Sequence, residues 1–338
     1  MTLSLLTVIV PTYNRVDSLR RLLNVLTIEL AGAEAVVDVI IGDNASIDET
    51  PSIIAEFVAA SPVRVDVLRH EANIGPERNF LACFDRANST YIWILGDDDL
   101  PRAGLIRHII PLLDKHQPDL LYIGSDWRKR NYDNDPHDPV AVINPVWLDQ
   151  ESFARSVNIF TTFISGMIVN RERYLNSFQT VPLEDIIGTS LVQLGWVLDS
   201  LRAGRLFMMI DAPHILATAD NSSGYQPYRV FGANFATICS KIYGPDHRIT
   251  RIMVTRAIIY HLPQLIWNTR YARVPGFSHE SLAGASRHEL RGYWGYWLIL
   301  EPIASLPLVL ARCMLLFSRV LAQTLKYLDS QRVQRVGL

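Results

Sequence analysis

Short apolar runs alternate with segments of helical periodicity over the first 125 residues. The runs are rich in Val and Ile and alternate little between polar and apolar residues, as strands buried on both faces do. This order predicts an α/β fold with a mainly parallel sheet, right-handed crossovers and flanking helices. The expected strands are 5–10, 36–41, 63–68, 91–95 and 120–124, and the expected helices are 17–26, 52–60, 80–87 and 103–115.

The chain becomes less regular after residue 125. Residues 126–145 are polar and predict a surface loop or hairpin, and 161–169 are expected to be extended. A helix is expected over 187–203, ending at Gly204. Residues 252–267 and 293–328 are strongly apolar.

Composition narrows the class of partner. The 338 residues are 49% hydrophobic and 20% charged, with a formal net charge of −2. The chain can therefore bury a sizeable core, and it has no overall positive field that would attract nucleic acid. Its three cysteines are far apart in sequence, which favours neither a metal site nor a disulfide framework and suits a reducing compartment.

An acidic run gives the strongest sign of chemistry. The apolar residues 92–95 lead directly into Gly96, Asp97, Asp98 and Asp99. Adjacent carboxylates repel one another, which is costly at a strand end unless a cation lies between them. Hard divalent cations prefer oxygen ligands and bridge carboxylates to diphosphates. The alternative is an acidic turn in which Asp99 caps the next helix.

Two other strand ends carry polar or aromatic residues. Asp43 follows the second strand, where its carboxylate could accept hydrogen bonds from a base or ribose, while Asp48 is better explained as a helix cap. Pro11 is expected to stop the first strand, and Tyr13 in the following loop could stack on a nucleobase or pack at the rim. Ligands of parallel sheets bind beyond the carboxyl ends of the strands, where these residues would lie.

The segment 73–79 opens the third helix. Gly75 permits a tight turn after Asn73. Arg78 would stand in the first helical turn, where the helix dipole disfavours a cation, so a reach toward phosphate would explain its position. An ordinary surface arginine explains it equally well.

These segments together resemble glycosyltransferase family 2, an inverting group with the GT-A fold. Residues 8–15, 42–48, 73–79 and the Asp97–Asp99 run match four family motifs in the family's order, over roughly residues 5–125. The acidic run with residues 162–166 looks most like the subgroup that includes abequosyltransferases of O-antigen assembly. The resemblance implies Mn²⁺ or Mg²⁺ at Asp99 and Asp97. It implies a nucleotide-sugar donor at Pro11, Tyr13, Arg15, Asp43, Asn73, Gly75, Arg78, Asp97 and Asp98.

The catalytic base departs from the family pattern. Many members carry it in a Glu-Asp pair about eleven residues before the glycine that closes the acceptor helix, and Val192-Gln193 stand there in this chain. The acceptor hydroxyl still needs a group to take its proton. Asp185 is the first candidate and Glu184 the second, although both could simply favour a helix N-terminus.

The apolar tail leaves three possibilities open. Glu301, Pro302, Pro307 and Arg312 interrupt the run 293–328, which argues against a clean membrane span. Arginine and lysine recur among its Leu, Val and Phe residues, which favours helices lying on an anionic membrane. A buried core or oligomer contact is the third possibility.

The resulting prediction is a metal-dependent inverting glycosyltransferase. Residues 1–215 would form the GT-A domain, with a donor half (1–125) and an acceptor half (126–215), and 216–338 a helical, membrane-associating extension. The acceptor would be a glycan, lipid-linked at the cytoplasmic face of the bacterial inner membrane. One alternative is a sugar-nucleotide-binding protein without transferase activity. The other is a sugar-nucleotidyltransferase, which would be expected to carry a Gly-rich basic loop after the first strand.

Overall fold

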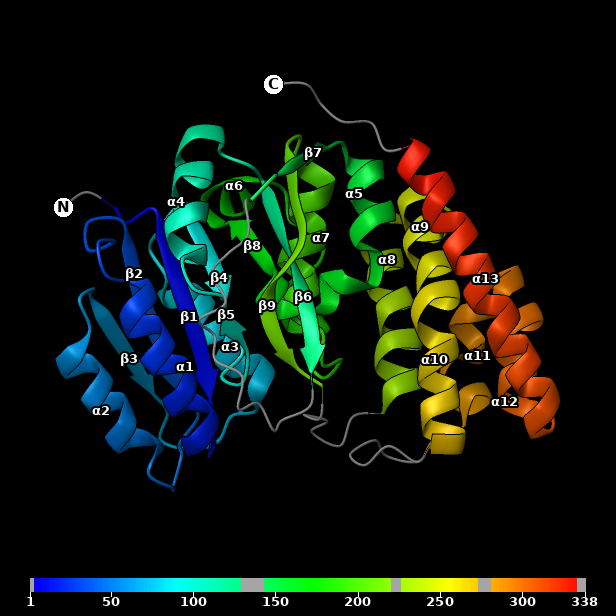
Figure 1. Ribbon diagram of the computed structural model, residues 1–338, viewed down its shortest axis with the longest axis horizontal. Helices are drawn as coiled ribbons and strands as arrows, with labels where there is room; N and C mark the ends of the chain where they lie inside the picture. Colours follow the sequence, from blue (N-terminus) through cyan, green and yellow to red (C-terminus); the bar gives the residue numbers. More distant parts are fainter. Residues whose placement is uncertain (1–2, 129–142, 220–225, 273–280, 333–338) are drawn as a thin grey trace. The chain divides into compact units, whose positions relative to one another are not determined.

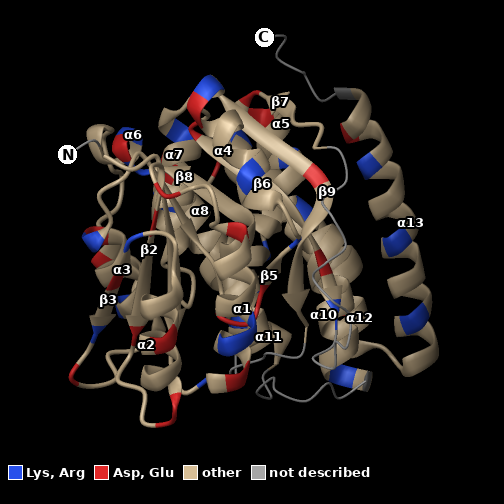
Figure 2. Cartoon of the chain, turned by 60° about the vertical axis from the view of Figure 1, so that its left-hand side comes forward, with Lys and Arg blue, Asp and Glu red and all other residues tan. Residues whose placement is uncertain are grey.

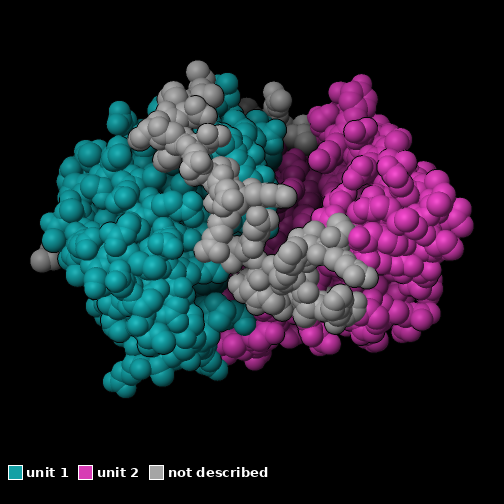
Figure 3. Space-filling view, turned by 60° about the horizontal axis from the view of Figure 1, so that its bottom comes forward, with its two compact units in different colours: residues 1–147, 163–179, 199–219 teal, residues 148–162, 180–198, 220–338 magenta. Residues whose placement is uncertain are grey.

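The computed structural model describes residues 3–128, 143–219, 226–272 and 281–332. The chain forms two compact units, coloured separately in Figure 3. Unit 1 comprises Met1–Trp147, Phe163–Gln179 and Asp199–Ala219, and unit 2 comprises the remaining segments. The chain passes into unit 2 for the last time after Ala219. Two earlier segments, Leu148–Thr162 and Thr180–Leu198, also belong to unit 2.

Unit 1 is built on one mixed, largely parallel sheet (Figure 1). Its strand order is β3-β2-β1-β4-β8-β6-β9-β5, and β7 also pairs with β9. The first four strands of this order are parallel, β8 runs antiparallel to both of its neighbours, and β6 and β9 are parallel. The strands are β1 (Leu6–Thr12), β2 (Val37–Asp43), β3 (Val65–Arg69), β4 (Tyr91–Ile94), β5 (Leu100–Pro101), β6 (Leu120–Arg128), β7 (Val146–Leu148), β8 (Met167–Asn170) and β9 (Phe207–Thr218).

Helices cover both faces of this sheet because its central strands are apolar on both sides. Leu6, Val8 and Val10 of β1 point into a core shared with α1, α2 and α4. On the other face α3 packs against β1 and β2. The helices of unit 1 are α1 (Val16–Glu29), α2 (Thr50–Ala60), α3 (Pro76–Arg86), α4 (Leu105–His116) and α6 (Arg171–Asn176), and α7 (Gln193–Ala203) enters it at Asp199.

The predicted α/β fold with a mainly parallel sheet is confirmed, but four local expectations are wrong. The sequence offers Asp17 as the cap of the first helix, but α1 begins at Val16 after Arg15 and has no side-chain cap. Pro11 does not stop the first strand, because β1 continues to Thr12. Residues 161–166 form 3₁₀ turns and only 167–170 are extended. The helix expected over 187–203 begins only at Gln193.

Unit 2 is helical. A π-helical turn (Ala257–His261) joins α9 to α10, other π-helical turns precede α8 and α12 and follow α10, and α13 is long and continuous (Figure 1). Its helices are α5 (Gln150–Val157), α8 (Phe235–Tyr243), α9 (Arg248–Arg256), α10 (Leu262–Trp267), α11 (Leu282–Leu290), α12 (Glu301–Ser305) and α13 (Leu308–Arg332).

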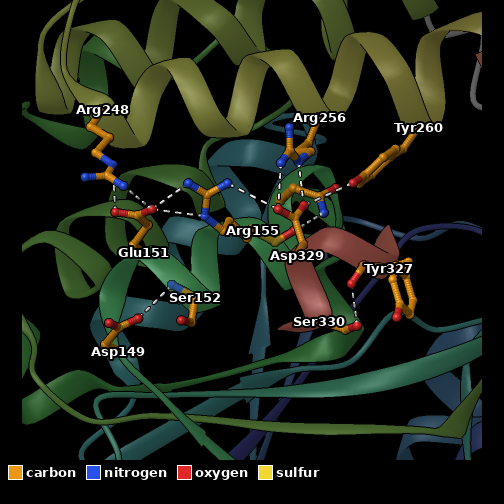
Figure 4. Close-up of polar contacts among 11 residues, drawn as sticks. Asp149, Glu151, Ser152, Arg155, Arg248, Arg256, Tyr260, Tyr327, Asp329 and Ser330 are labelled. Carbon is orange, nitrogen blue, oxygen red and sulfur yellow. Dashed lines mark hydrogen bonds and ion pairs between the residues drawn. The ribbon is translucent and has the colours of Figure 1, made fainter. Parts of the chain in front are cut away.

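A buried ion cluster ties α13 to α5 and α9 (Figure 4). The Asp329 carboxylate accepts from Arg256 at 2.8 and 2.7 Å and from Arg155 at 3.2 Å. The side chains of Asp329, Arg256 and Arg155 are only 9%, 10% and 12% exposed. Removing one partner from a buried cluster leaves uncompensated charge, which costs more than the pair itself contributes.

We therefore predict that Asp329→Ala lowers the free energy of unfolding by about 3–5 kcal/mol, because two buried guanidinium groups lose their shared acceptor. Denaturant unfolding of the full chain measures this loss. Asp246→Ala is the matched control, because Asp246 pairs with Arg251 at 2.7 Å while 84% exposed, and it should cost less than about 1 kcal/mol. Equal losses in the two variants would contradict the prediction.

Candidate functional site

The polar motifs meet at one edge of the sheet in unit 1. Strands β1, β2 and β4 are parallel neighbours, so the loops that follow them emerge side by side. Asp43 ends β2, and the acidic run follows Ile94 at the end of β4. The predicted juxtaposition of the strand-end motifs is thus present in the fold.

The first two carboxylates of the acidic run face the β1 loop. Asp97 is 7% exposed and accepts a hydrogen bond from the Thr12 hydroxyl at 2.8 Å. One Arg15 Nη atom lies 3.3 Å from Asp97 Oδ1 and 3.2 Å from Asp98 Oδ2. Arg15, expected to bind the donor, therefore bridges two of the three carboxylates.

Asp99 is held by neutral donors. The Ser165 hydroxyl donates to Asp99 Oδ2 at 2.5 Å, and the Thr218 amide donates to Oδ1 at 3.1 Å. Ser165 Oγ also accepts from the Gly96 amide at 2.8 Å, which fixes the start of the run. Asp99 does not act as a simple exposed cap, because it is 6% exposed and bonds to residues distant in sequence.

Burial shapes the electrostatics of the run. Desolvation, opposed by Arg15, raises the pKa of Asp97 to about 6. Desolvation and the neighbouring Asp98 charge raise the pKa of Asp99 to about 7. Arg15 lies beside Asp97 and Asp98, whereas Asp99 is held by hydroxyl and amide donors, so the fold buries carboxylates that repel one another.

The chemistry of this donor set fits a hard divalent cation. The run offers carboxylate oxygens, the ligands that Mg²⁺ and Mn²⁺ prefer. A cation held by Asp97 and Asp99 would offset the burial and repulsion that raise their pKa values. The described residues contain no group of three or more acids, histidines or cysteines already arranged as a complete metal cage. The remaining ligands would then come from the substrate or water.

The loops after β1 and β2 brace one another. Asp43 Oδ1 accepts from the Ser46 amide at 2.9 Å, and the Ser46 hydroxyl accepts from the Asn14 amide at 2.9 Å. Asp43 is 1% exposed, and its Oδ2 lies 3.6 Å from Arg69 Nε with no hydrogen-bond partner among the described residues. That oxygen retains capacity to accept a hydrogen bond. Tyr13 is 40% exposed beside these loops.

The start of α3 adjoins the β2 loop. Gly75 has φ +85°, a left-handed conformation that favours glycine, and the Asn73 side chain accepts from its amide at 2.9 Å. Asn44 donates to Asn73 at 2.9 Å, which links the two segments. Arg78 is exposed and has no hydrogen bond or ion pair within the described part of the chain. Its guanidinium group is available to an anionic ligand.

The candidate bases lie in the other unit. Glu184 and Asp185 belong to a single 3₁₀ turn in unit 2, Leu183–Ile186, and both are exposed. Asp199, on α7, is fully buried and pairs with Arg202 at 3.0 Å, which makes it a structural group.

Three residues that hold the acidic run were not assigned a role from the sequence: Thr12, Ser165 and Thr218. Thr12 and Ser165 lie inside segments that carry the family resemblance, so the motifs could have suggested them. Thr218 ends β9, 119 positions after Asp99, and no local pattern marks it. Its hydroxyl also donates to the Asp98 carbonyl at 2.8 Å.

Comparison with known proteins supports these observations. Abequosyltransferase RfbV of Salmonella typhimurium is 29% identical over 230 residues, which are 63% of this chain and 66% of that protein. The TarS 1–349 structure from S. aureus in complex with UDP-GlcNAc has a TM-score of 0.58 at 17% identity, over 79% of this chain and 76% of that one. A further TarS 1–349 structure from S. aureus has a TM-score of 0.55 at 16% identity, over 97% of this chain and 91% of that one.

The family model described as glycosyl transferase family 2 matches residues 7–176, just over half of the chain, and covers the three loops and the acidic run. The structural likeness to TarS shows that the two share a GT-A-like fold. The protein therefore belongs to glycosyl transferase family 2.

Proposed function

We propose that this enzyme transfers a sugar from a nucleotide-sugar donor to a hydroxyl group of a glycan acceptor, with inversion at the anomeric carbon and dependence on Mn²⁺ or Mg²⁺. The observation that carries the metal dependence is the acidic run, in which the buried carboxylates of Asp97 and Asp99 have raised pKa values beside Asp98. Family membership favours transfer over donor binding without turnover and over nucleotidyl transfer.

The donor would lie across the carboxyl ends of β1, β2 and β4. Tyr13 offers an exposed ring for stacking on the base, and Asp43 Oδ2 offers an acceptor for the base or ribose. Arg78 and Arg15 would approach the phosphates. Pro11, Asn73 and Gly75 shape the loops that hold these side chains. Asp97 and Asp98 would approach the ribose or sugar, and Asp99, with Asp97, would hold the cation.

A single displacement needs a base on one side of the anomeric carbon and charge stabilisation on the other. A bound divalent cation would supply Lewis-acid stabilisation of the departing diphosphate. Asp185, or else Glu184, would take the proton of the acceptor hydroxyl, and both are accessible to an acceptor. Ser165 and Thr218 would keep the Asp99 carboxylate fixed, so little reorganisation is needed when the donor binds.

The acceptor is proposed to be a lipid-linked saccharide in cell-surface polysaccharide assembly, such as O-antigen or exopolysaccharide. The similarity to an abequosyltransferase supports this choice, as does the apolar helix α13, which suits contact with the cytoplasmic face of the bacterial inner membrane. Oligomer formation is compatible with the proposal.

Asp99→Asn should reduce metal-dependent donor turnover about 100-fold or more while leaving the fold intact. Asparagine has nearly the same shape, and the buried carboxylate it replaces has a raised pKa, so stability at pH 7 should not fall. Turnover is measured on a nucleotide-sugar panel with Mn²⁺, after chelation, and after Mn²⁺ is restored. Asp114→Asn, an exposed acid on α4, is the control. Full activity of Asp99→Asn, or of the chelated enzyme, would remove the metal assignment.

Asp185→Asn should lower kcat for transfer about 100-fold, the contribution expected of a general base, with little change in donor KM. Glu184→Gln is the matched variant, since Glu184 is exposed on the same turn, and it should stay within a few-fold of the wild type. A large loss for Glu184→Gln alone would move the base to that residue. Unimpaired transfer by both variants would place the base elsewhere.

A further inference from the structure

Helix α13 exposes an unusual amount of apolar surface. The segment Leu308–Gln331 is long and apolar enough to cross a membrane, yet little of it is buried against the rest of unit 2. Val320 is 61% exposed and Tyr327 is 65% exposed. The exposed large apolar residues of this helix are Leu308, Val309, Leu310, Leu316, Phe317, Val320, Tyr327 and Leu328.

The buried residues of α13 form one narrow stripe along the helix. They are Ala311, Leu315, Ser318 and Asp329. At 100° per residue these positions line up within about a quarter of the circumference. Leu316, Val320 and Tyr327 lie on the opposite side, away from the helices that α13 contacts.

Three basic residues form a row between the stripe and the exposed apolar side. Arg312, Arg319 and Lys326 are spaced by seven residues, about 10 Å along the helix axis. Arg319 donates to the Gln264 side chain at 2.6 Å, so the row follows the edge where α13 meets α10. Figure 2 shows basic residues recurring along α13. The helix has one acidic residue, Asp329, and that residue is buried.

The same residues disfavour a spanning helix. Arg319 stands near the middle of Leu308–Gln331, so a span would carry a cation into the centre of the bilayer. A spanning α13 would also separate Asp329 from Arg155 and Arg256. The carboxylate and the two guanidinium groups would then each lose their buried partner of opposite charge. The ion cluster therefore fixes α13 against unit 2 with its apolar side facing outward.

We propose that α13 lies in the plane of an anionic membrane, with Leu316, Val320 and Tyr327 in the acyl region and the basic row at the phosphate headgroups. Amphipathic helices with cations beside an apolar side bind anionic lipid surfaces in this way. A second copy of the chain fits this apolar side less well. The exposed charges described on α13 are all positive, so they would repel one another across a symmetric dimer interface. The inference deepens the proposed lipid-linked acceptor and rests on that function only for the acceptor's identity.

Vesicle co-sedimentation of the full chain tests the contact. The wild type should bind phosphatidylcholine vesicles that contain phosphatidylglycerol, and bind pure phosphatidylcholine at least tenfold more weakly. Val320→Ser should weaken binding to the anionic vesicles at least fivefold. Ile28→Ser on α1 is the matched control, because Ile28 is also 61% exposed, and it should bind like the wild type. Equal binding by both variants would overturn the proposal.

Cys313 reports the orientation without further mutation. It is exposed on the apolar side of α13, whereas Cys83 and Cys239 are buried. Anionic vesicles should protect it from a water-soluble maleimide, and alkaline carbonate should release the protein from cell membranes. Retention of the protein in the membranes after the carbonate wash would indicate a spanning helix. A dimer that forms without vesicles and that Val320→Ser dissociates would indicate contact with a second copy. Either result overturns the proposal.

Hydrolysis of the sugar donor in the absence of lipid separates this proposal from the proposed function. Loss of hydrolysis would count against the proposed function. Unchanged hydrolysis with failed vesicle binding would count against the membrane contact alone.

Discussion

The burial of neighbouring carboxylates at the end of β4 is the constraint on which the site depends. Asp97 and Asp98 share Arg15, and Asp99 receives a hydroxyl from Ser165 and an amide from Thr218. Burial raises the pKa values of Asp97 and Asp99, so the fold holds these carboxylates together at a cost in free energy. A divalent cation would offset that cost. The later strands of the sheet contribute directly, because Ser165 precedes β8 and Thr218 ends β9.

The parts of the fold with a local signal were predictable from the sequence. The strands β1, β2 and β4 and the helices between them carry their own periodicity, and strand polarity places Asp43 beside the acidic run. The extended conformation predicted for 161–166 was wrong because a short apolar stretch with β-branched residues can also form 3₁₀ turns. Thr218 could not be predicted, since its contact with Asp99 depends on the packing of β5 and β9. The acceptor side lacked a motif, so Asp185 remains a prediction.

In unit 2, one buried contact bears on three possibilities that the sequence leaves open. The apolar tail alone allowed a span, a core helix or an interfacial helix. The burial of Asp329 against Arg155 and Arg256 sets which side of α13 faces inward and therefore which side is exposed. The seven-residue spacing of the basic residues becomes meaningful only with that orientation known. The donor site proposed in unit 1 and the membrane contact proposed for α13 in unit 2 would together suit an enzyme whose donor is soluble and whose acceptor is lipid-linked.

Anomalous diffraction from crystals containing Mn²⁺ and a nucleoside diphosphate tests the central claim most directly, with UDP, GDP, CDP and dTDP tried in turn. The account predicts a manganese peak about 2.0–2.3 Å from a carboxylate oxygen of Asp99 or Asp97. The diphosphate should complete the coordination, and Arg15 should move from its bridge between Asp97 and Asp98 toward the phosphates. A nucleotide bound at this edge with manganese absent from the acidic run, or bound elsewhere on the chain, would contradict the account.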